Sequence, residues 1–133
     1  MRERVLAVAR ELGLPLEPRS RTFNSRRAQE LGKFAQKMGR MEAYQKEVYR
    51  AYFVDGCNIA LRDELLKIAQ RAGLPEEETG QVLDERVFAR EVDEDWQRAR
   101  LLGISGVPAF LRERKLLVGF RPYQDLVSLM TPD

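Results

Sequence analysis

One short stretch marks where this 133-residue chain changes from helix to strand: Gly103-Ile104-Ser105-Gly106-Val107-Pro108-Ala109-Phe110. Gly103 ends the preceding helical pattern, because glycine adopts the left-handed backbone of a helix cap without steric cost. Pro108 opens an apolar run, and a proline, which has no N–H, belongs at a strand start or an edge. The sequence does not determine whether the Val107–Pro108 peptide bond is cis or trans. Only about 5–6% of such bonds are cis in folded proteins, so a trans bond is the default expectation. If the bond is cis, the strand entrance is a fixed shelf with exposed backbone groups.

The residues after this stretch predict a hairpin and a final helix. Residues 108–112 and 115–119 have the composition of two short strands around Glu113-Arg114, a turn that lacks glycine and asparagine. Pro122 opens a helix at its first turn, where a missing N–H is harmless. The spacing of the apolar residues predicts that this helix buries Tyr123, Leu126, Val127 and Met130.

The residues before the stretch predict six helices. Apolar side chains recur at helical spacing over about 2–12, from 24 or 25 to 38, over 40–54 and 60–72, from Pro75 onward, and over 85–102. Either Asn24 or Ser25 can cap the second helix. The chain is therefore expected to be α+β and mostly helical. We expect a single domain, 1–133, with a helical subdomain over 1–102 and a thioredoxin-like β-β-α piece over 103–133.

Composition excludes several classes of protein. Hydrophobic residues make up 44% of the chain and charged residues 33%, which is typical of a soluble, helix-rich globule. The net charge of +2 is too small to indicate a nucleic-acid partner. No apolar run approaches the roughly 20 residues of a membrane span. The first ten residues include Glu3 and lack a long apolar centre, so they do not resemble a secretory signal, and a cytoplasmic location is expected.

The scarcity of reactive side chains limits the chemistry of the chain. There is no histidine, which excludes Ser-His-Asp and Cys-His nucleophile pairs. Cys57 is the single cysteine, so neither a zinc site nor a disulfide within the chain is possible, and no metal or cofactor is expected. We interpret Cys57 as a structural residue. The alternative is a reactive thiol, regulatory or engaged in a disulfide between molecules.

The C-terminal motifs carry a family resemblance. GISGVPAF at 103–110, the hairpin LRERKLLVGF at 111–120 and RPYQDL at 121–126 resemble the C-terminal end of DsbA-like thioredoxin-fold proteins, in particular the FrnE-type disulfide oxidoreductases. The 2-hydroxychromene-2-carboxylate isomerases and kappa-class glutathione transferases are related to them. Weaker matches follow in order upstream, at Glu11-Leu12-Gly13-Leu14-Pro15, Asn24-Ser25-Arg26-Arg27-Ala28 and Ala51-Tyr52-Phe53-Val54-Asp55-Gly56.

The resemblance covers nearly all of this chain but only about the last two-thirds of a family member. It implies a DsbA-like helical insertion followed by the C-terminal β-hairpin and helix of a thioredoxin fold. The N-terminal β-α-β unit with its Cys-x-x-Cys pair is missing from the residues given. An isolated hairpin is marginally stable, and an open apolar edge recruits another strand. We therefore expect either that N-terminal unit or a homodimer, paired through the 108–112 strands, to cover the edge.

The resemblance also implies a binding site without a catalytic residue. In the family the residue at Pro108 is a cis-proline that faces the redox cysteines. The site residues implied here are Gly106, Val107 and Pro108, with the N–H and C=O of Val107 offered to an extended peptide or thiol substrate. Because the cysteine pair is absent, these residues would retain the ability to bind a substrate but would lack the cysteines that react with it.

Three functions are compatible with these residues. The first is a truncated or degenerate DsbA-like thiol–disulfide oxidoreductase, inactive by itself. The second is a glutathione-dependent isomerase or kappa-class transferase relative, the only alternative in which glutathione binds. The third is a non-catalytic helical binding or dimerisation module. The isomerase relatives usually carry a Trp-Gly-x-Asp-type segment after the hairpin, and this chain has Val118-Gly119-Phe120-Arg121-Pro122 there, which favours the first function.

Overall fold

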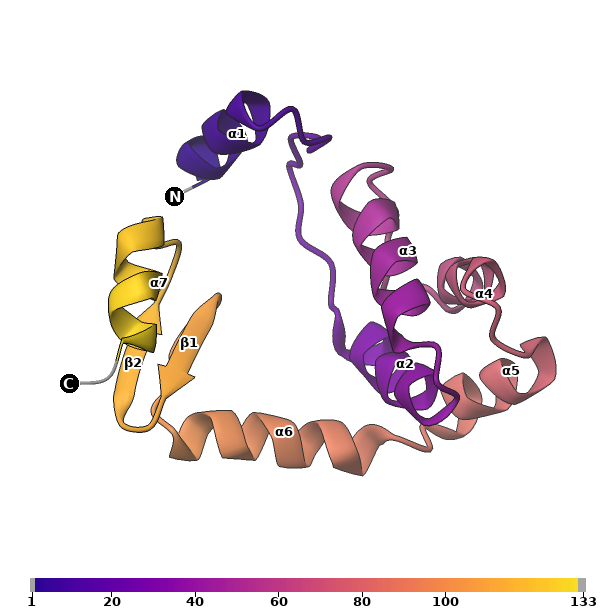
Figure 1. Cartoon of the computed structure of the whole chain (residues 1–133). Coiled ribbons are helices and arrows are strands. Elements are labelled where there is room, and N and C mark those ends of the chain that lie inside the picture. Colours follow the sequence, from indigo (N-terminus) through magenta and orange to yellow (C-terminus); the bar gives the residue numbers. More distant parts are fainter. Residues whose placement is uncertain (1, 132–133) are drawn as a thin grey trace. The chain divides into compact units, whose positions relative to one another are not determined.

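A computed structural model describes residues 2–131 of the chain, which divides into two compact units, Met1–Val92 and Asp93–Asp133 (Figure 1). The expected α+β, mostly helical class is confirmed over this part of the chain. The elements in order are α1 (Arg2–Glu11), α2 (Arg26–Lys37), α3 (Met41–Phe53), α4 (Arg62–Arg71), α5 (Glu76–Glu85), α6 (Ala89–Leu101), β1 (Ala109–Arg112), β2 (Lys115–Val118) and α7 (Tyr123–Met130).

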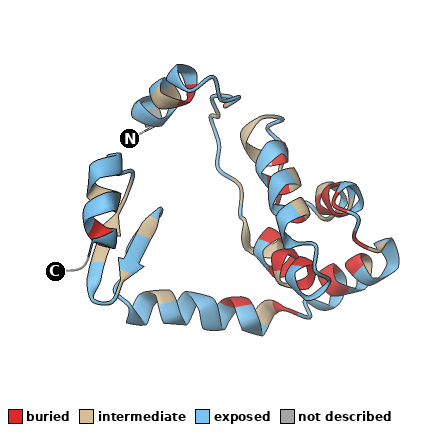
Figure 2. Ribbon diagram, in the orientation of Figure 1, coloured by how far each residue is buried: buried red, intermediate tan, exposed pale blue. Residues whose placement is uncertain are grey.

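Four helices of the first unit, α2 to α5, pack around one hydrophobic core. α2 contacts α3 and α5, and α4 contacts the same two helices. Each helix supplies an apolar stripe at the 3.6-residue spacing that the sequence showed, and Figure 2 shows the buried positions gathered on these helices. Tyr44 is buried among them, and its hydroxyl donates a 2.7 Å hydrogen bond to the carbonyl of Ala28. The fully buried side chains of this core include Leu31, Leu65, Ile68 and Leu83.

The helix boundaries agree with the sequence to within two residues, with one exception. The helix predicted over 85–102 begins only at Ala89, because α5 continues to Glu85 and Arg86 then adopts a left-handed backbone with φ of 52°. A non-glycine residue in this conformation is uncommon, and it leaves no signal in the sequence. Val87, which was placed inside that helix, lies in the turn instead and is 53% exposed.

The start of α2 distinguishes between the two candidate capping residues. Ser25 occupies the N-cap position but makes no side-chain cap bond. The side-chain oxygen of Asn24 accepts a 2.9 Å hydrogen bond from the backbone N–H of Arg26. Asn24 is therefore the residue that satisfies a backbone donor at this helix start.

The second unit contains the predicted hairpin. β1 and β2 form a two-stranded antiparallel sheet in the described chain, with a register from Ala109 opposite Val118 to Arg112 opposite Lys115. The turn between them has no glycine, and Glu113 takes the left-handed conformation, with φ of 55°. Arg112 donates hydrogen bonds to the last carbonyls of α7, at 3.2 Å to Leu129 and also to Met130. This side chain joins β1 to the final helix.

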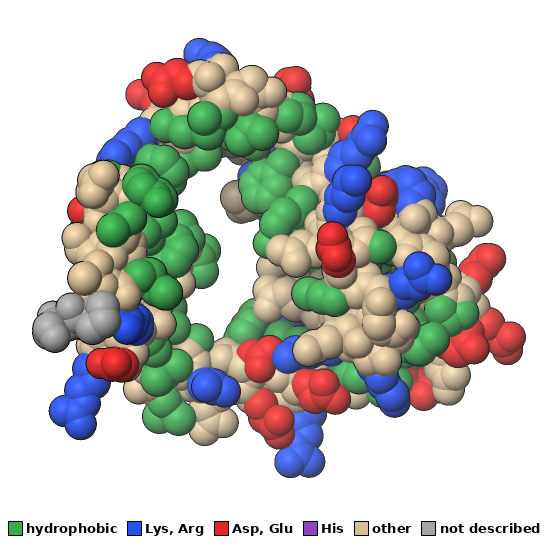
Figure 3. Space-filling model, viewed as in Figure 1, with side chains coloured by type: hydrophobic (Ala, Val, Ile, Leu, Met, Phe, Trp, Pro, Cys, Tyr) green, Lys and Arg blue, Asp and Glu red, His purple; other side chains and the backbone are tan. Residues whose placement is uncertain are grey.

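The face of α7 that contacts the hairpin differs from the expected one. Leu129 is buried, whereas Tyr123 and Met130 are 76% and 67% exposed and Val127 is also exposed. The predicted buried side is therefore wrong for Tyr123, Val127 and Met130, whereas Leu126 is half-buried. A two-stranded hairpin covers only one side of a helix, so the rest of the apolar surface of α7 remains in solvent. Figure 3 shows hydrophobic side chains along α7 and the hairpin.

Candidate functional site

The residues implied as a binding site lie together at the entrance to β1. Gly106, Val107 and Pro108 lead directly into the strand, and the Val107–Pro108 peptide bond is cis. The side chain of Val107 is 82% exposed. A Cβ atom at Gly106 would lie 3.4 Å from a methyl group of Val118, which is close to ordinary van der Waals contact, so this segment runs beside β2. These residues bring no ionisable side chain to the site.

The hydrogen-bond ladder defines which backbone groups face away from β2. Gly119 donates a 2.7 Å hydrogen bond to the carbonyl of Pro108. In an antiparallel pair, the residues that exchange hydrogen bonds with the partner strand alternate with residues whose N–H and C=O groups point the other way. Given the register, Phe110 and Arg112 pair with β2 as Pro108 does. Ala109 and Leu111 therefore direct their backbone groups to the opposite edge of β1, along which the described residues supply no further strand.

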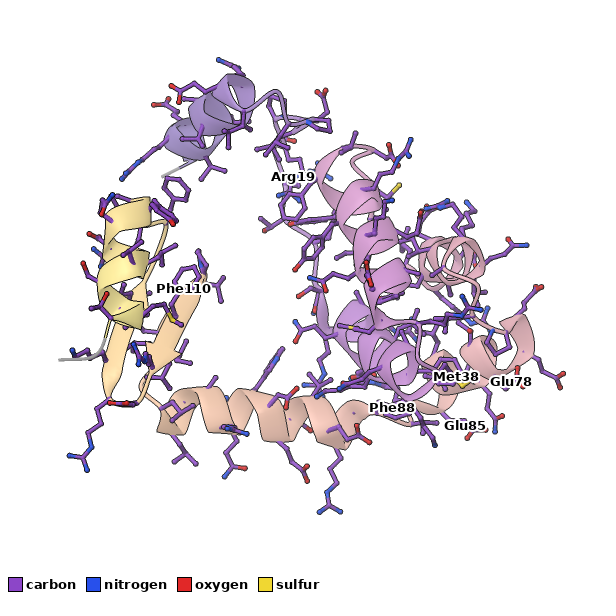
Figure 4. All side chains as sticks on the ribbon, in the orientation of Figure 1. Arg19, Met38, Glu78, Glu85, Phe88 and Phe110 are labelled. Carbon is purple, nitrogen blue, oxygen red and sulfur yellow. The ribbon has the colours of Figure 1, made fainter. Side chains whose placement is uncertain are left out.

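This edge combines main-chain hydrogen-bonding groups with apolar side chains. Phe110 and Leu111 are 37% and 40% exposed, and Figure 4 shows the Phe110 side chain on β1. A free strand edge binds an extended peptide by strand addition, with backbone bonds for affinity and side-chain contacts for selectivity. The arrangement has the chemistry of a docking edge for a peptide, without a group that could act as nucleophile, acid or base.

Cys57 lies in the first unit, in the loop between α3 and α4, and is partly buried. Its backbone N–H donates a 2.8 Å hydrogen bond to the carbonyl of Ala51. Burial, the negative charges of Glu64 and Asp55, and a hydrogen bond between the thiol and Glu64 raise the pKa of Cys57. Because the thiolate is the attacking form of cysteine, this environment disfavours nucleophilic reactions.

The sequence did not predict two sets of side-chain contacts. One is the contact of Arg112 with the end of α7. The other is in the first unit, where the carboxylate of Glu30 accepts hydrogen bonds from Arg26 and Arg86. The Arg26 and Glu30 pair has the helical i, i+4 spacing and was visible in the sequence, but no pattern connects either residue with Arg86. Within residues 2–131, no group of three or more histidine, cysteine or acidic side chains is arranged to hold a metal ion. Nor does that range contain a helix long and apolar enough to cross a membrane.

Comparison with known proteins extends these observations. A family model, the DSBA-like thioredoxin domain, matches residues 1–131. The crystal structure of a probable DsbA oxidoreductase from Streptomyces coelicolor is similar, with a TM-score of 0.82 and 30% sequence identity. The similarity covers 98% of this chain and 61% of that one, so this chain spans about three-fifths of the length of its relative. A search of curated proteins found no match.

Proposed function

The chain belongs to the DSBA-like thioredoxin domain family, and from this premise we propose that it forms the substrate-docking part of a thiol–disulfide oxidoreductase. The substrate is an extended peptide or a thiol compound, held at Gly106, Val107 and Pro108. The chain by itself is inactive in disulfide exchange. The observation that carries the proposal is the edge of β1, whose backbone groups at Ala109 and Leu111 point away from β2.

Several features of the second unit support docking at this edge. Among the described residues, no backbone hydrogen bond engages Val107, which precedes the ladder. Its exposed side chain and those of Phe110 and Leu111 give an arriving peptide apolar surface to contact. Pro108 has no N–H, so its only main-chain group in the ladder is the carbonyl that accepts from Gly119. An added strand would thus find donors and acceptors on one side of β1 without displacing β2.

The proposed inactivity follows from the number of cysteines in the chain. Thiol–disulfide exchange needs an attacking thiolate and a second thiol that resolves the mixed disulfide. The chain has one cysteine, and the pKa of Cys57 is raised rather than lowered. A docked substrate would therefore find no cysteine pair on residues 1–133 with which to exchange.

The first experiment measures activity. In an insulin-reduction assay with dithiothreitol, we expect this polypeptide to add nothing to the rate of dithiothreitol alone, while an oxidoreductase with an intact Cys-x-x-Cys pair accelerates it. Turnover above the background that persists in the Cys57→Ser variant would contradict the proposed inactivity.

The second experiment measures docking by amide chemical shifts. Titration with a short reduced cysteine peptide is expected to shift the amides of Val107, Ala109 and Leu111, which face the free edge, and to leave those of Phe110 and Arg112 nearly unchanged. Uniform shifts along β1, or none, would contradict strand addition. A response to reduced glutathione but not to the peptide would favour the glutathione-dependent relatives instead.

A macromolecular partner for the same edge is part of the proposal. Tyr123, Val127 and Met130 lie on one side of α7 and are exposed, and the hairpin has only two strands in the described chain. We propose that a further strand covers the edge, supplied by a β-α-β unit outside residues 1–133 or by a second copy paired through 108–112. Sedimentation velocity separates the two, because the second copy requires a dimer at micromolar concentration that Leu111→Lys dissociates. A monomer under these conditions would exclude the dimer.

A further inference from the structure

An open, largely apolar pocket of about 330 Å³ lies in the first unit, apart from the docking edge. Helix α1 contributes Val5 and Leu6 to its lining, and the loop after α1 contributes residues 16–19. The last residue of α3, Phe53, completes the lining. The volume lies within the roughly 300–1,000 Å³ usual for small-molecule sites. This pocket is therefore a candidate for a small ligand.

Backbone hydrogen bonds hold the pocket loop against both helices. The N–H of Leu14 donates a 2.8 Å bond to the carbonyl of Ala9, a buried residue of α1. The N–H of Glu17 donates a 3.0 Å bond to the carbonyl of Phe53, at the end of α3. The loop is thus fixed near its start and again inside the pocket, so the lining residues are already in place before a ligand arrives.

Arg19 supplies the positive charge of the lining. Its guanidinium carbon lies 3.5 Å from the centre of the Tyr52 ring and 4.8 Å from that of Phe53. One terminal nitrogen donates a hydrogen bond of 3.4 Å to the carbonyl of Tyr52. Figure 4 shows Arg19 beside the C-terminal end of α3. Stacking on two aromatic rings holds the guanidinium at this position.

The stacked guanidinium keeps donors for a ligand. Stacking occupies the face of the group, whereas its five N–H donors lie in its plane. Among the described residues, the bond to Tyr52 is the one hydrogen bond that the Arg19 side chain donates, and no carboxylate pairs with it. Arg19 is half-buried, so a ligand would meet its charge beside protein rather than in bulk water. Two oxygen atoms of a carboxylate match a guanidinium in a bidentate geometry.

Glu17 limits the charge of the ligand. It lines the same pocket, is exposed, and forms no ion pair with Arg19 in the described chain. Its negative charge repels a second anionic group on a ligand, which disfavours phosphate esters and dicarboxylates. The other lining side chains are Val5, Leu6, Leu16, Pro18 and Phe53, all of them apolar. The lining therefore matches a single negative charge attached to an apolar body.

We propose that this pocket binds a small molecule with one carboxylate group on an apolar body, such as a medium-chain fatty acid. The carboxylate accepts hydrogen bonds from the in-plane N–H groups of Arg19. The apolar body contacts Val5, Leu6 and Leu16 and leaves water there. This site lies in the first unit and does not depend on peptide docking at β1.

The test uses the full chain and amide chemical shifts at neutral pH and constant ionic strength. Octanoate is expected to shift the amides of residues 5, 6, 16, 17, 19 and 53 and the Nε–H signal of Arg19, with a dissociation constant of about 1 mM. Octanamide has the same length without the charge, and acetate has the charge without the apolar body. Each is expected to bind at least about tenfold more weakly than octanoate.

Three results of this titration would overturn the proposal. The first is equal affinity for octanoate and either octanamide or acetate. The second is the absence of shifts at the pocket residues up to about 20 mM octanoate. The third is a set of octanoate shifts confined to residues 107–111, which would place the ligand at the docking edge instead.

Matched variants assign the binding to Arg19. Arg19→Gln is expected to weaken octanoate binding by about tenfold or more, and Arg19→Lys, which keeps the charge but loses the planar fork, by a smaller factor. Arg21→Gln removes an exposed arginine of the same loop outside the pocket and is expected to change the affinity less than about twofold. Thermal unfolding checks that each variant is folded, and Arg19→Lys serves if Arg19→Gln is not. Equal losses in the Arg19 and Arg21 variants would overturn the proposal.

A variant of Glu17 tests the proposed charge balance with the opposite sign. Glu17→Gln removes the negative charge that faces the carboxylate of the ligand, so octanoate is expected to bind about twofold or more tightly. The affinity for octanamide should stay unchanged, because this probe carries no charge. Weaker octanoate binding by Glu17→Gln would contradict the proposed placement of the carboxylate at Arg19.

Discussion

The two units of this protein have similar amphipathic sequences but different degrees of closure. The sixteen residues of the main hydrophobic cluster all fall between Ala28 and Phe88, in the first unit. In the described part of the second unit, Leu129 is the one buried hydrophobic residue. Apolar spacing on a helix therefore predicts which face is apolar, but burial requires a second layer to cover that face. α2 to α5 supply this layer for one another, whereas α7 has only a two-stranded hairpin.

A matched pair of leucines gives the largest expected effect. Leu65 is fully buried in the first unit, and Leu111 is 40% exposed on β1. Leu65→Ala is expected to lower the free energy of unfolding by about 2–5 kcal/mol, because it leaves a cavity in a closed core. Leu111→Ala is expected to cost less than about 1 kcal/mol, because little apolar surface returns to water. Urea unfolding followed by far-UV circular dichroism measures both.

Equal losses for the two leucines would abolish the contrast between the units. That result would mean that Leu111 is covered in solution, and sedimentation velocity on the same sample would show whether a second copy covers it. A small loss for Leu65→Ala would mean instead that the first unit repacks freely around the missing side chain.

The buried carboxylate of Glu30 should produce the next largest effect. Burial acts to raise its pKa, but the hydrogen bonds and charges of Arg86 and Arg26 outweigh burial, so the pKa of Glu30 is lowered in the folded protein. The stabilisation is therefore complete above the unfolded-state pKa of about 4.3 and is lost as the pH falls through the folded-state value. Glu30→Gln is expected to cost about 1–3 kcal/mol at neutral pH. Its difference from the natural protein should shrink below about pH 4, as urea unfolding at several pH values would show.

Asp84→Asn is the surface counterpart of this experiment. Arg62 lowers the pKa of Asp84 through two short hydrogen bonds, so the pH dependence has the same sign. Both side chains are exposed, and water and salt screen such pairs, so a much smaller loss is expected. A larger loss for Asp84→Asn than for Glu30→Gln would contradict the role of burial. A difference for Glu30→Gln that grows towards acid pH would contradict the sign of its pKa shift.

Local patterns in the sequence predicted the positions of the helices and strands more reliably than their tertiary contacts and burial. The helix spacing, the glycines and the proline before β1 located α1 to α5, the hairpin and α7 to within two residues. The predicted start of α6 was wrong because Arg86 adopts a left-handed conformation and contacts Glu30, 56 positions away, and neither feature follows from a local pattern. The burial of α7 was wrong because periodicity contains no information on whether a covering layer exists.

The candidate sites divide in the same way. The implied binding site consists of three consecutive residues, Gly106, Val107 and Pro108, so a local motif was sufficient to group them. The family match supports the resemblance from which this motif was interpreted. The cluster of Glu30 with Arg26 and Arg86 combines α2 with the turn after α5, and no local pattern joins these two segments. Clusters of residues from different helices can be identified only when the packing of those helices is known.

The reactivity of Cys57 gives the smallest effect and compares the two units directly. Its raised pKa and partial burial predict that iodoacetamide alkylates it at least about tenfold more slowly in the folded protein than in urea. Val107→Cys in a Cys57→Ser background places a thiol at the exposed strand entrance, where we expect a rate close to that of the unfolded chain. Glu64→Gln removes one of the charges that raise the pKa of Cys57 and should accelerate its alkylation several-fold. Fast labelling of folded Cys57 would make it a reactive thiol, whereas slow labelling at position 107 would indicate that the docking edge is already covered in solution.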